Sequence, residues 1–138
     1  DVLIPGARPY LINRKNVDAI KAKVISSIAN IPITNEAEDI LFKKGVLSVP
    51  DFISNSGGVI LGVVDVLGGK VEDVFKVVNN YIGPIATSIL KEARQQNINP
   101  RALAIKKTTA KVLKARRQPR ADIDMMKVMD DLKKQLGI

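Results

Sequence analysis

Three short apolar runs within the first 49 residues place the strongest constraint on the fold. They lie at residues 2–4, 23–28 and 46–49, and helical or helix-capping patterns separate each run from the next. Short apolar runs bounded by turn residues are typical of strands buried in a sheet, and parallel strands need long connections between them. The pattern therefore predicts an α/β fold in which about three parallel strands alternate with helices.

Local signals predict the helices between these strands. Val17 and Ile20 have helical spacing, which predicts a helix over residues 16–22. Thr34 is a typical N-cap for a helix that runs to Lys44, and Gly45 is typical of the position just beyond a helix end.

The pattern from Lys70 onward is helical, with interruptions at Gly83–Pro84, at 97–100 and at 118–120. Pro84 is expected to kink the helix or to restart it near its first turn, and Asn99 is expected to cap a helix that starts at Pro100. The apolar residues over 122–136 recur at helical spacing, which predicts an amphipathic helix that docks on the same chain or on a partner. We therefore expect two regions, residues 1–68 and residues 69–138, with the second packing on the first.

Composition excludes several kinds of site. The chain of 138 residues has no Cys and no His, so disulfides and metal sites built on thiolate or imidazole are excluded. These absences fit a cytoplasmic protein. The apolar stretch at 59–67 is interrupted by Gly62 and Asp65 and is too short to cross a bilayer, so no membrane association is expected.

The net charge of +8 is concentrated in one segment. Residues 91–120 hold ten Lys and Arg residues against the single acid Glu92. One interpretation is a stripe that binds nucleic acid; the other is a solvated or subunit-facing helix. We favour the second, because no aromatic residues alternate with these charges and no helix-turn-helix or zinc pattern accompanies them.

The segment at 49–59 is the first candidate for a binding site. The apolar run ends at Val49, and Gly57 and Gly58 follow just before apolar residues resume. Glycine lets another molecule approach the backbone closely, and ligands of open α/β sheets bind at the carboxyl ends of strands. Neither a G-x-G-x-x-G nor a phosphate-loop motif is present, so a phosphate-cradling turn is not encoded.

Three segments in the same order, 1–7, 21–36 and 41–59, resemble the glutamate, leucine, phenylalanine and valine dehydrogenases, a family of amino acid dehydrogenases. The likeness continues more weakly over 101–114. It implies the second half of a Rossmann-like NAD(P)-binding domain followed by C-terminal helices, in a parent enzyme that is usually a homo-oligomer. That enzyme would reversibly deaminate an L-amino acid to a 2-oxo acid with NAD or NADP. In the family, the phosphate loop and the catalytic Lys and Asp come before the matched part, so this chain holds no catalytic residue and is expected to be inactive alone.

The resemblance also assigns roles to individual residues. The implied cofactor-binding residues are Gly6, Ala7, Asn30, Asn55, Gly57 and Gly58, and the implied substrate-pocket residues are Val59 and Gly62. Gly62 stands where glutamate enzymes place a serine, which is more similar to the branched-chain and aromatic members, so a glutamate substrate is not assumed. Each residue type also has an ordinary structural role: Asn30 in a turn, Asn55 as a helix N-cap, and the paired glycines in tight packing.

Two other classes of function remain open from the sequence. A remnant without a catalytic half would act as a binding or scaffold module, with nucleic acid bound through residues 91–120 as one form. The helix at 122–136 would otherwise be a structural contact for a partner helix, and Leu132 lies on its apolar stripe.

Overall fold

The computed structural model describes residues 1–116 and 124–137 of the chain. Its three strands form one parallel sheet in the order β1 (Val2–Leu3), β2 (Val24–Ser26) and β3 (Leu47–Val49). Ile25 lies at the centre of the sheet, opposite Leu3 on one side and Ser48 on the other. The predicted α/β class with three parallel strands is confirmed, although each strand is shorter than the apolar run that predicted it.

Helix α1 (Asn35–Lys43) packs beside the sheet and closes the first core cluster. The Thr34 hydroxyl accepts a hydrogen bond from the backbone N–H of Ala37 at 3.3 Å, and Gly45 has a φ of +76°. Both ends of this helix are therefore as predicted. The core cluster beneath it contains Ile12, Val17, Ile25, Ile33, Ala37, Leu41 and Val46.

The helix predicted over residues 16–22 is wrong. Only a 3₁₀ turn, η1 (Val17–Ala19), forms there. The Asn16 side chain accepts from the backbone N–H of Asn13 and donates to the carbonyl of Leu11, both at 2.9 Å, so it stabilises a turn. Val17 is fully buried. The apolar spacing thus reflects a loop anchored in the core, because local side-chain bonds compete with helix formation here.

The described residues that follow β3 are mostly helical. The elements are α2 (Asp51–Ser54), α3 (Gly57–Val66), α4 (Val71–Val77), η2 (Val78–Ile82), α5 (Gly83–Gln96), α6 (Pro100–Arg116) and α7 (Met125–Leu136). Ile53 of α2 packs with residues of α5 and α6 in a second core cluster.

Pro84 lies in the first turn of α5, as predicted, but the chain stays helical on both sides of it. The segment just before it, η2, is a π-helical turn. A π-helical turn changes the hydrogen-bond spacing locally, which accommodates a residue that lacks a backbone N–H. The next connection is also as predicted: Asn99 Oδ1 accepts from the backbone N–H of Arg101 at 2.9 Å and caps α6.

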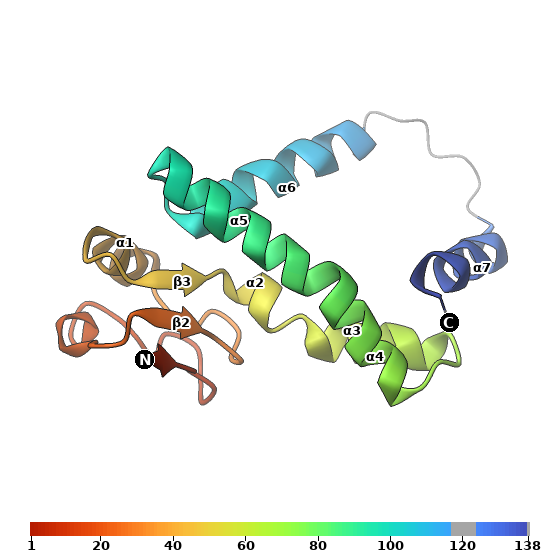
Figure 1. Cartoon of the computed structure of the whole chain (residues 1–138), viewed down its shortest axis with the longest axis horizontal. Coiled ribbons are helices and arrows are strands. Elements are labelled where there is room, and N and C mark those ends of the chain that lie inside the picture. Colours follow the sequence, from red (N-terminus) through yellow and green to blue (C-terminus); the bar gives the residue numbers. More distant parts are fainter. Residues whose placement is uncertain (117–123, 138) are drawn as a thin grey trace.

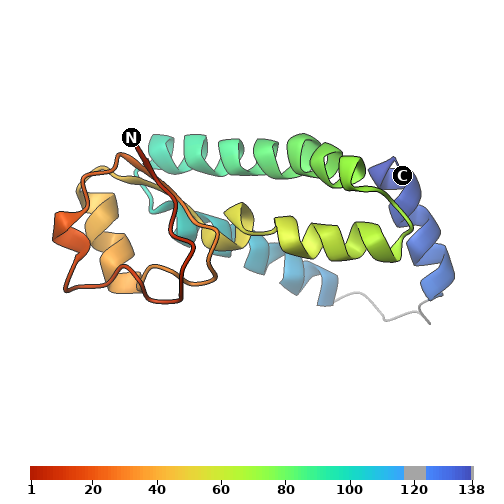
Figure 2. The same ribbon diagram turned by 90° about the horizontal axis from the view of Figure 1, so that it is seen from below.

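The helices extend away from the sheet as an arm. Helix α3 packs against α4, and α7 lies across the far end of the arm (Figures 1 and 2). The Tyr81 hydroxyl donates to the carbonyl of Gln135 at 2.8 Å, so α7 makes at least this contact within its own chain. The predicted break at 118–120 lies outside the described residues, and the division into regions 1–68 and 69–138 stays a prediction. Within the described ranges, no helix combines the length and the apolarity needed to cross a bilayer.

Candidate functional site

The carboxyl ends of the three strands are joined through the backbone of one residue, Ala29. Its N–H donates to the carbonyl of Pro5, after β1, at 3.0 Å. Its own carbonyl accepts from the Asn55 amide, after β3, at 3.3 Å. Because Ala29 follows β2, these bonds tie together the turns after all three strands. The predicted residues Gly6, Asn30 and Asn55 therefore lie at one edge of the sheet.

Helix α2 holds the turn after β2 through side chains on one face. The Ser54 hydroxyl donates to the carbonyl of Ser27 at 2.7 Å, and Asp51 Oδ2 accepts from the backbone N–H of Ile31 at 2.6 Å. Asp51, Ser54 and Asn55 are three and four residues apart, so they share a helix face. That face binds the segment 27–31, which carries Asn30.

The predicted site residues differ in how far they reach solvent. Gly6, Ala7 and Asn30 are exposed, and Asn55 is half-buried. Val59, the third residue of α3, has 73% of its surface exposed. The turns after the strands and the first turn of α3 thus follow one another along an open edge of the sheet.

Asn55 does not cap α3. It ends α2, and the residue before α3 is Ser56, whose side chain makes no capping hydrogen bond. The alternative in which Asn55 serves only as a helix N-cap is therefore wrong.

The glycines of α3 are not required by packing within the described chain. A Cβ added to Gly57, Gly58 or Gly62 would meet no neighbouring atom within 4 Å. These three positions are consequently open to another molecule, and the tight-packing alternative for Gly57 and Gly58 is wrong among the described residues.

An ion-paired cluster lies behind the site and was not expected from the sequence. Arg101 of α6 donates through Nε to Glu38 of α1 and through Nη2 to Asp51 of α2. Both carboxylate side chains are 3% exposed and the Arg101 side chain is 18% exposed. The guanidinium carbon also lies 5.6 Å from the centre of the Phe52 ring, within cation–π range.

The two carboxyl groups of this cluster respond to it in opposite ways. Burial raises the pKa of Glu38, and the attraction of Arg101 offsets this only in part. Burial also raises the pKa of Asp51, but the Ile31 N–H and the Arg101 guanidinium outweigh it and leave that pKa below its usual value. Asp51 is therefore a carboxylate that accepts hydrogen bonds from Ile31 and Arg101, whereas Glu38 has one buried oxygen, Oε1, without a partner among the described residues.

Sequence reasoning missed this cluster because its members are far apart in the chain. Glu38 is one of several acids in the first turns of α1, and Arg101 is one of ten basic residues in the segment 91–120. The one local signal was Asp51, an acid two residues after Val49, where the predicted strand ends.

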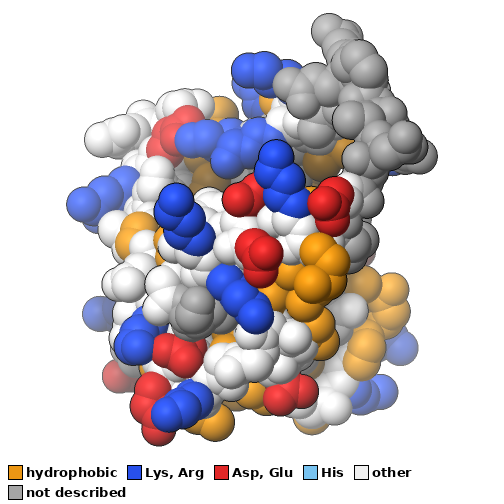
Figure 3. Space-filling view, turned by 90° about the vertical axis from the view of Figure 1, so that its right-hand side faces the viewer, with side chains coloured by type: hydrophobic (Ala, Val, Ile, Leu, Met, Phe, Trp, Pro, Cys, Tyr) orange, Lys and Arg blue, Asp and Glu red, His pale blue; other side chains and the backbone are white. Residues whose placement is uncertain are grey.

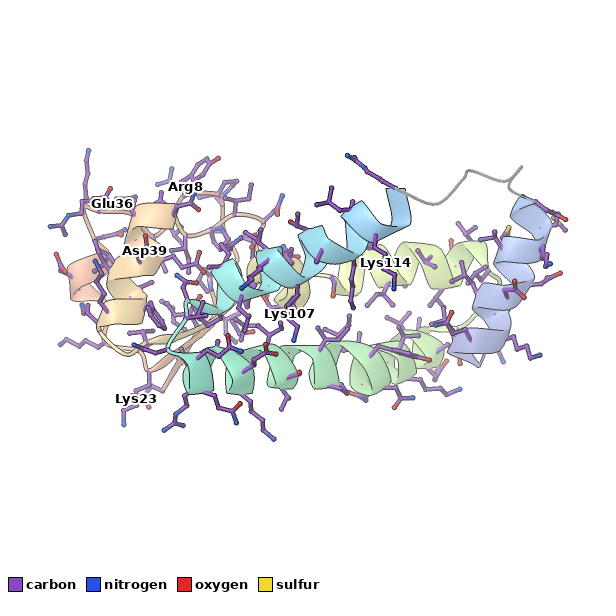
Figure 4. The ribbon with its side chains drawn as sticks, turned by 90° about the horizontal axis from the view of Figure 1, so that it is seen from above. Arg8, Lys23, Glu36, Asp39, Lys107 and Lys114 are labelled. Atoms are coloured by element: carbon purple, nitrogen blue, oxygen red, sulfur yellow. The ribbon has the colours of Figure 1, made fainter. Side chains whose placement is uncertain are left out.

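The described part of the basic segment, residues 91–116, lies mostly on α5 and α6, and part of its charge is neutralised by ion pairs within the chain. Lys107 points from α6 toward α5 and pairs with Glu92 (Figure 4). Arg101 is bound by its two acids. At the end of the molecule where α7 lies, acidic and basic side chains are mixed with exposed apolar ones (Figure 3). Arg117 and Arg120 lie outside the described residues. This arrangement does not favour a continuous basic surface for nucleic acid.

Among residues 1–116 and 124–137, no group of three or more acidic side chains forms a metal site.

Comparisons with known proteins agree on one relationship. A family model described as "Glutamate/Leucine/Phenylalanine/Valine dehydrogenase" matches residues 1–119. The chain is 51% identical over 65 residues to a glutamate dehydrogenase of Aeropyrum pernix, a match that covers 47% of this chain and 16% of that protein. It also superimposes on the crystal structure of L-tryptophan dehydrogenase from Nostoc punctiforme with a TM-score of 0.74 and 28% identity, over 86% of this chain and 35% of that one. The chain thus spans well under half the length of either relative.

Proposed function

The chain belongs to the glutamate/leucine/phenylalanine/valine dehydrogenase family, and from this premise we propose that it forms the nicotinamide-facing wall of the cofactor site of an amino acid dehydrogenase. The observation that carries the proposal is the pair of bonds through Ala29, which brings the turns after all three strands to one edge. The parent enzyme would convert an L-amino acid to a 2-oxo acid and back. It would use NAD or NADP as its cofactor. It would be located in the cytoplasm and would assemble as a homo-oligomer.

The residues at this edge suit a nicotinamide. The exposed Asn30 amide offers two donors and an acceptor, which complement the carboxamide of the ring. Gly6 and Ala7 are small and exposed, so the ribose can lie close to the backbone there. When bound, the nicotinamide supplies the hydride acceptor; the work of this chain is to orient the ring toward the substrate carbon.

Helix α3 would line the substrate pocket through Val59 and Gly62. Both are exposed, and Gly62 leaves open space where a side chain would stand. An apolar, roomy wall suits an apolar amino acid side chain better than a second carboxylate, because a buried carboxylate needs a partner. We therefore propose a branched-chain or aromatic amino acid as the substrate class.

The first test is NMR titration of the isolated chain with reduced nicotinamide mononucleotide. Half a site binds weakly, so we expect saturation only at about 1–10 mM. Shifts are expected at Gly6, at residues 29–31 and at residues 55–58. In a separate assay with oxidised NAD or NADP as the hydride acceptor, no oxidation of any amino acid is expected, since the catalytic groups of the family lie outside the matched part.

Adenosine monophosphate serves as the matched probe, because it carries the other half of the cofactor. Equal shifts with this probe, or shifts confined to α6, would contradict a nicotinamide wall. Measurable turnover by the isolated chain would contradict the proposed division of labour.

A second expectation separates binding from packing at Gly58. Substitution Gly58→Ala leaves the free energy of unfolding unchanged or raises it by up to about 1 kcal/mol, because alanine favours a helix and the added Cβ has space. The same substitution is expected to weaken the nicotinamide response, since the Cβ projects where the ring approaches. Thermal unfolding by circular dichroism and the titration above measure the two effects.

Gly68→Ala is the matched control. Gly68 has a φ of +78°, so alanine is strained there and stability should fall, while the titration should be unaffected. A Gly58→Ala variant that loses stability as Gly68→Ala does would show that Gly58 serves the fold.

A further inference from the structure

Ile31, the residue after Asn30, has an unusual backbone. Its φ is +48°, in the left-handed region that β-branched residues rarely adopt. Such a conformation persists only where surrounding contacts hold it. What holds Ile31 therefore also determines how Asn30 is presented.

Two hydrogen bonds fix this backbone from opposite sides. The carbonyl of Ile31 accepts from the N–H of Tyr10 at 2.8 Å, and Tyr10 itself has a φ of +54°. The N–H of Ile31 donates to Asp51 Oδ2 at 2.6 Å. That N–H belongs to the peptide plane it shares with the Asn30 carbonyl, so the Asp51 bond fixes the orientation of the main chain at Asn30.

Asp51 is in turn held by Arg101. The second oxygen of Asp51 accepts from Arg101 Nη2, while Arg101 Nε donates to Glu38. The guanidinium is a rigid fork, so it holds two carboxylates at a fixed separation, which a lysine ammonium on a flexible stem does not do. The three side chains are largely buried, and few other positions are open to them.

We propose that Arg101 is a positioning residue of the nicotinamide wall: through Asp51 it holds Ile31 in its left-handed conformation and so directs Asn30 toward the cofactor. This inference rests on the function proposed above. Arg101 lies fifty residues from Asp51 in the chain. A residue of α6 would thus control a turn that α6 does not itself form.

The test uses Arg101→Lys, which keeps the charge and removes the fork. Amide hydrogen exchange at Ile31 is measured by NMR, with Val24 and Leu47 of the sheet as internal references. Losing a charge-assisted hydrogen bond should speed exchange at Ile31 about tenfold to a hundredfold. The reference amides should keep their protection. Glu38→Gln, which retains an acceptor for Arg101 Nε, should leave Ile31 close to wild type, as should Arg94→Lys on α5.

Wild-type protection of Ile31 in Arg101→Lys would overturn the proposal, and so would equal loss of protection at all three amides. The nicotinamide titration supplies a separate readout. In Arg101→Lys the shift of the Asn30 side-chain amide should be lost while that of Gly58 persists; an unchanged Asn30 response would also overturn it. If the wild-type chain gives no nicotinamide response, the proposed function fails, and the exchange at Ile31 still decides whether Arg101 sets the conformation beside Asn30.

Discussion

Replacing Arg101 with methionine is expected to lower the free energy of unfolding by about 3–5 kcal/mol at neutral pH, because it leaves buried carboxylates without their cation. Glu38 and Asp51 are each 3% exposed, so water cannot take the place of the guanidinium without opening the structure. Methionine retains most of the apolar volume of the arginine stem, so the loss reports charge more than packing. Urea unfolding followed by circular dichroism measures it.

The loss of unfolding free energy caused by Arg101→Met should become smaller as the pH falls. In the wild-type chain the folded-state pKa of Asp51 lies below its unfolded value, so its stabilising contribution is present above the unfolded pKa and is lost as the pH falls through the folded pKa. The pKa of Glu38 is raised on folding, so its ionisation costs stability as the pH rises through the unfolded pKa toward the folded one. Without Arg101 both groups are easier to protonate, and protonation relieves the buried charge.

Lys106→Met is the control, since Lys106 is an exposed cation on the same helix. It should leave stability nearly unchanged at every pH. A penalty for Arg101→Met as small as that of the control, or one that grows toward acid pH, would contradict the role given to the ion-paired cluster.

Leu41→Ala is expected to cost about 2–5 kcal/mol, the range for removing a large aliphatic side chain from a well-packed core. Leu41 is fully buried and belongs to the cluster that joins α1 to the sheet. With only three short strands in the sheet, the loss of this contact affects most of the core on that side. Thermal and urea unfolding give the change.

Val59→Ala provides the comparison. Val59 is 73% exposed, so shortening it should hardly change stability in the isolated chain. If Leu41→Ala and Val59→Ala had similar effects, the core on the α1 side of the sheet would be placed wrongly.

Local signals predicted the elements that depend on local chemistry. Thr34 marks the start of α1 and Gly45 its end, because a hydroxyl cap and a left-handed glycine each act on the nearest turn of the helix. Asn99 caps α6 for the same reason. The helix predicted over 16–22 is wrong, because Val17 is buried in a loop. The spacing between a buried loop residue and the next apolar residue can resemble the spacing of a helix face.

The candidate site was predictable only in part. The family resemblance implied Gly6, Asn30 and Asn55 as cofactor-binding residues, and each of them follows one of three parallel strands, whose carboxyl ends lie at one edge of the sheet. The cluster of Glu38, Asp51 and Arg101 was not predictable, because it depends on how α6 returns to the sheet. Its partners are single charged residues, and a charged residue by itself predicts only a solvated surface.

The bonds of Ala29 have a consequence for how such a site can change over evolutionary time. Ala29 contributes only its main-chain N–H and carbonyl to these bonds. Nearly any residue other than proline at position 29 can therefore make them. Point mutation at Ala29 therefore cannot easily remove this junction, whereas loss of the Asn55 amide would break its link to the turn after β3. Substitutions around it can alter which amino acid is preferred while the scaffold that gathers the three turns persists, so specificity can drift without the architecture being rebuilt.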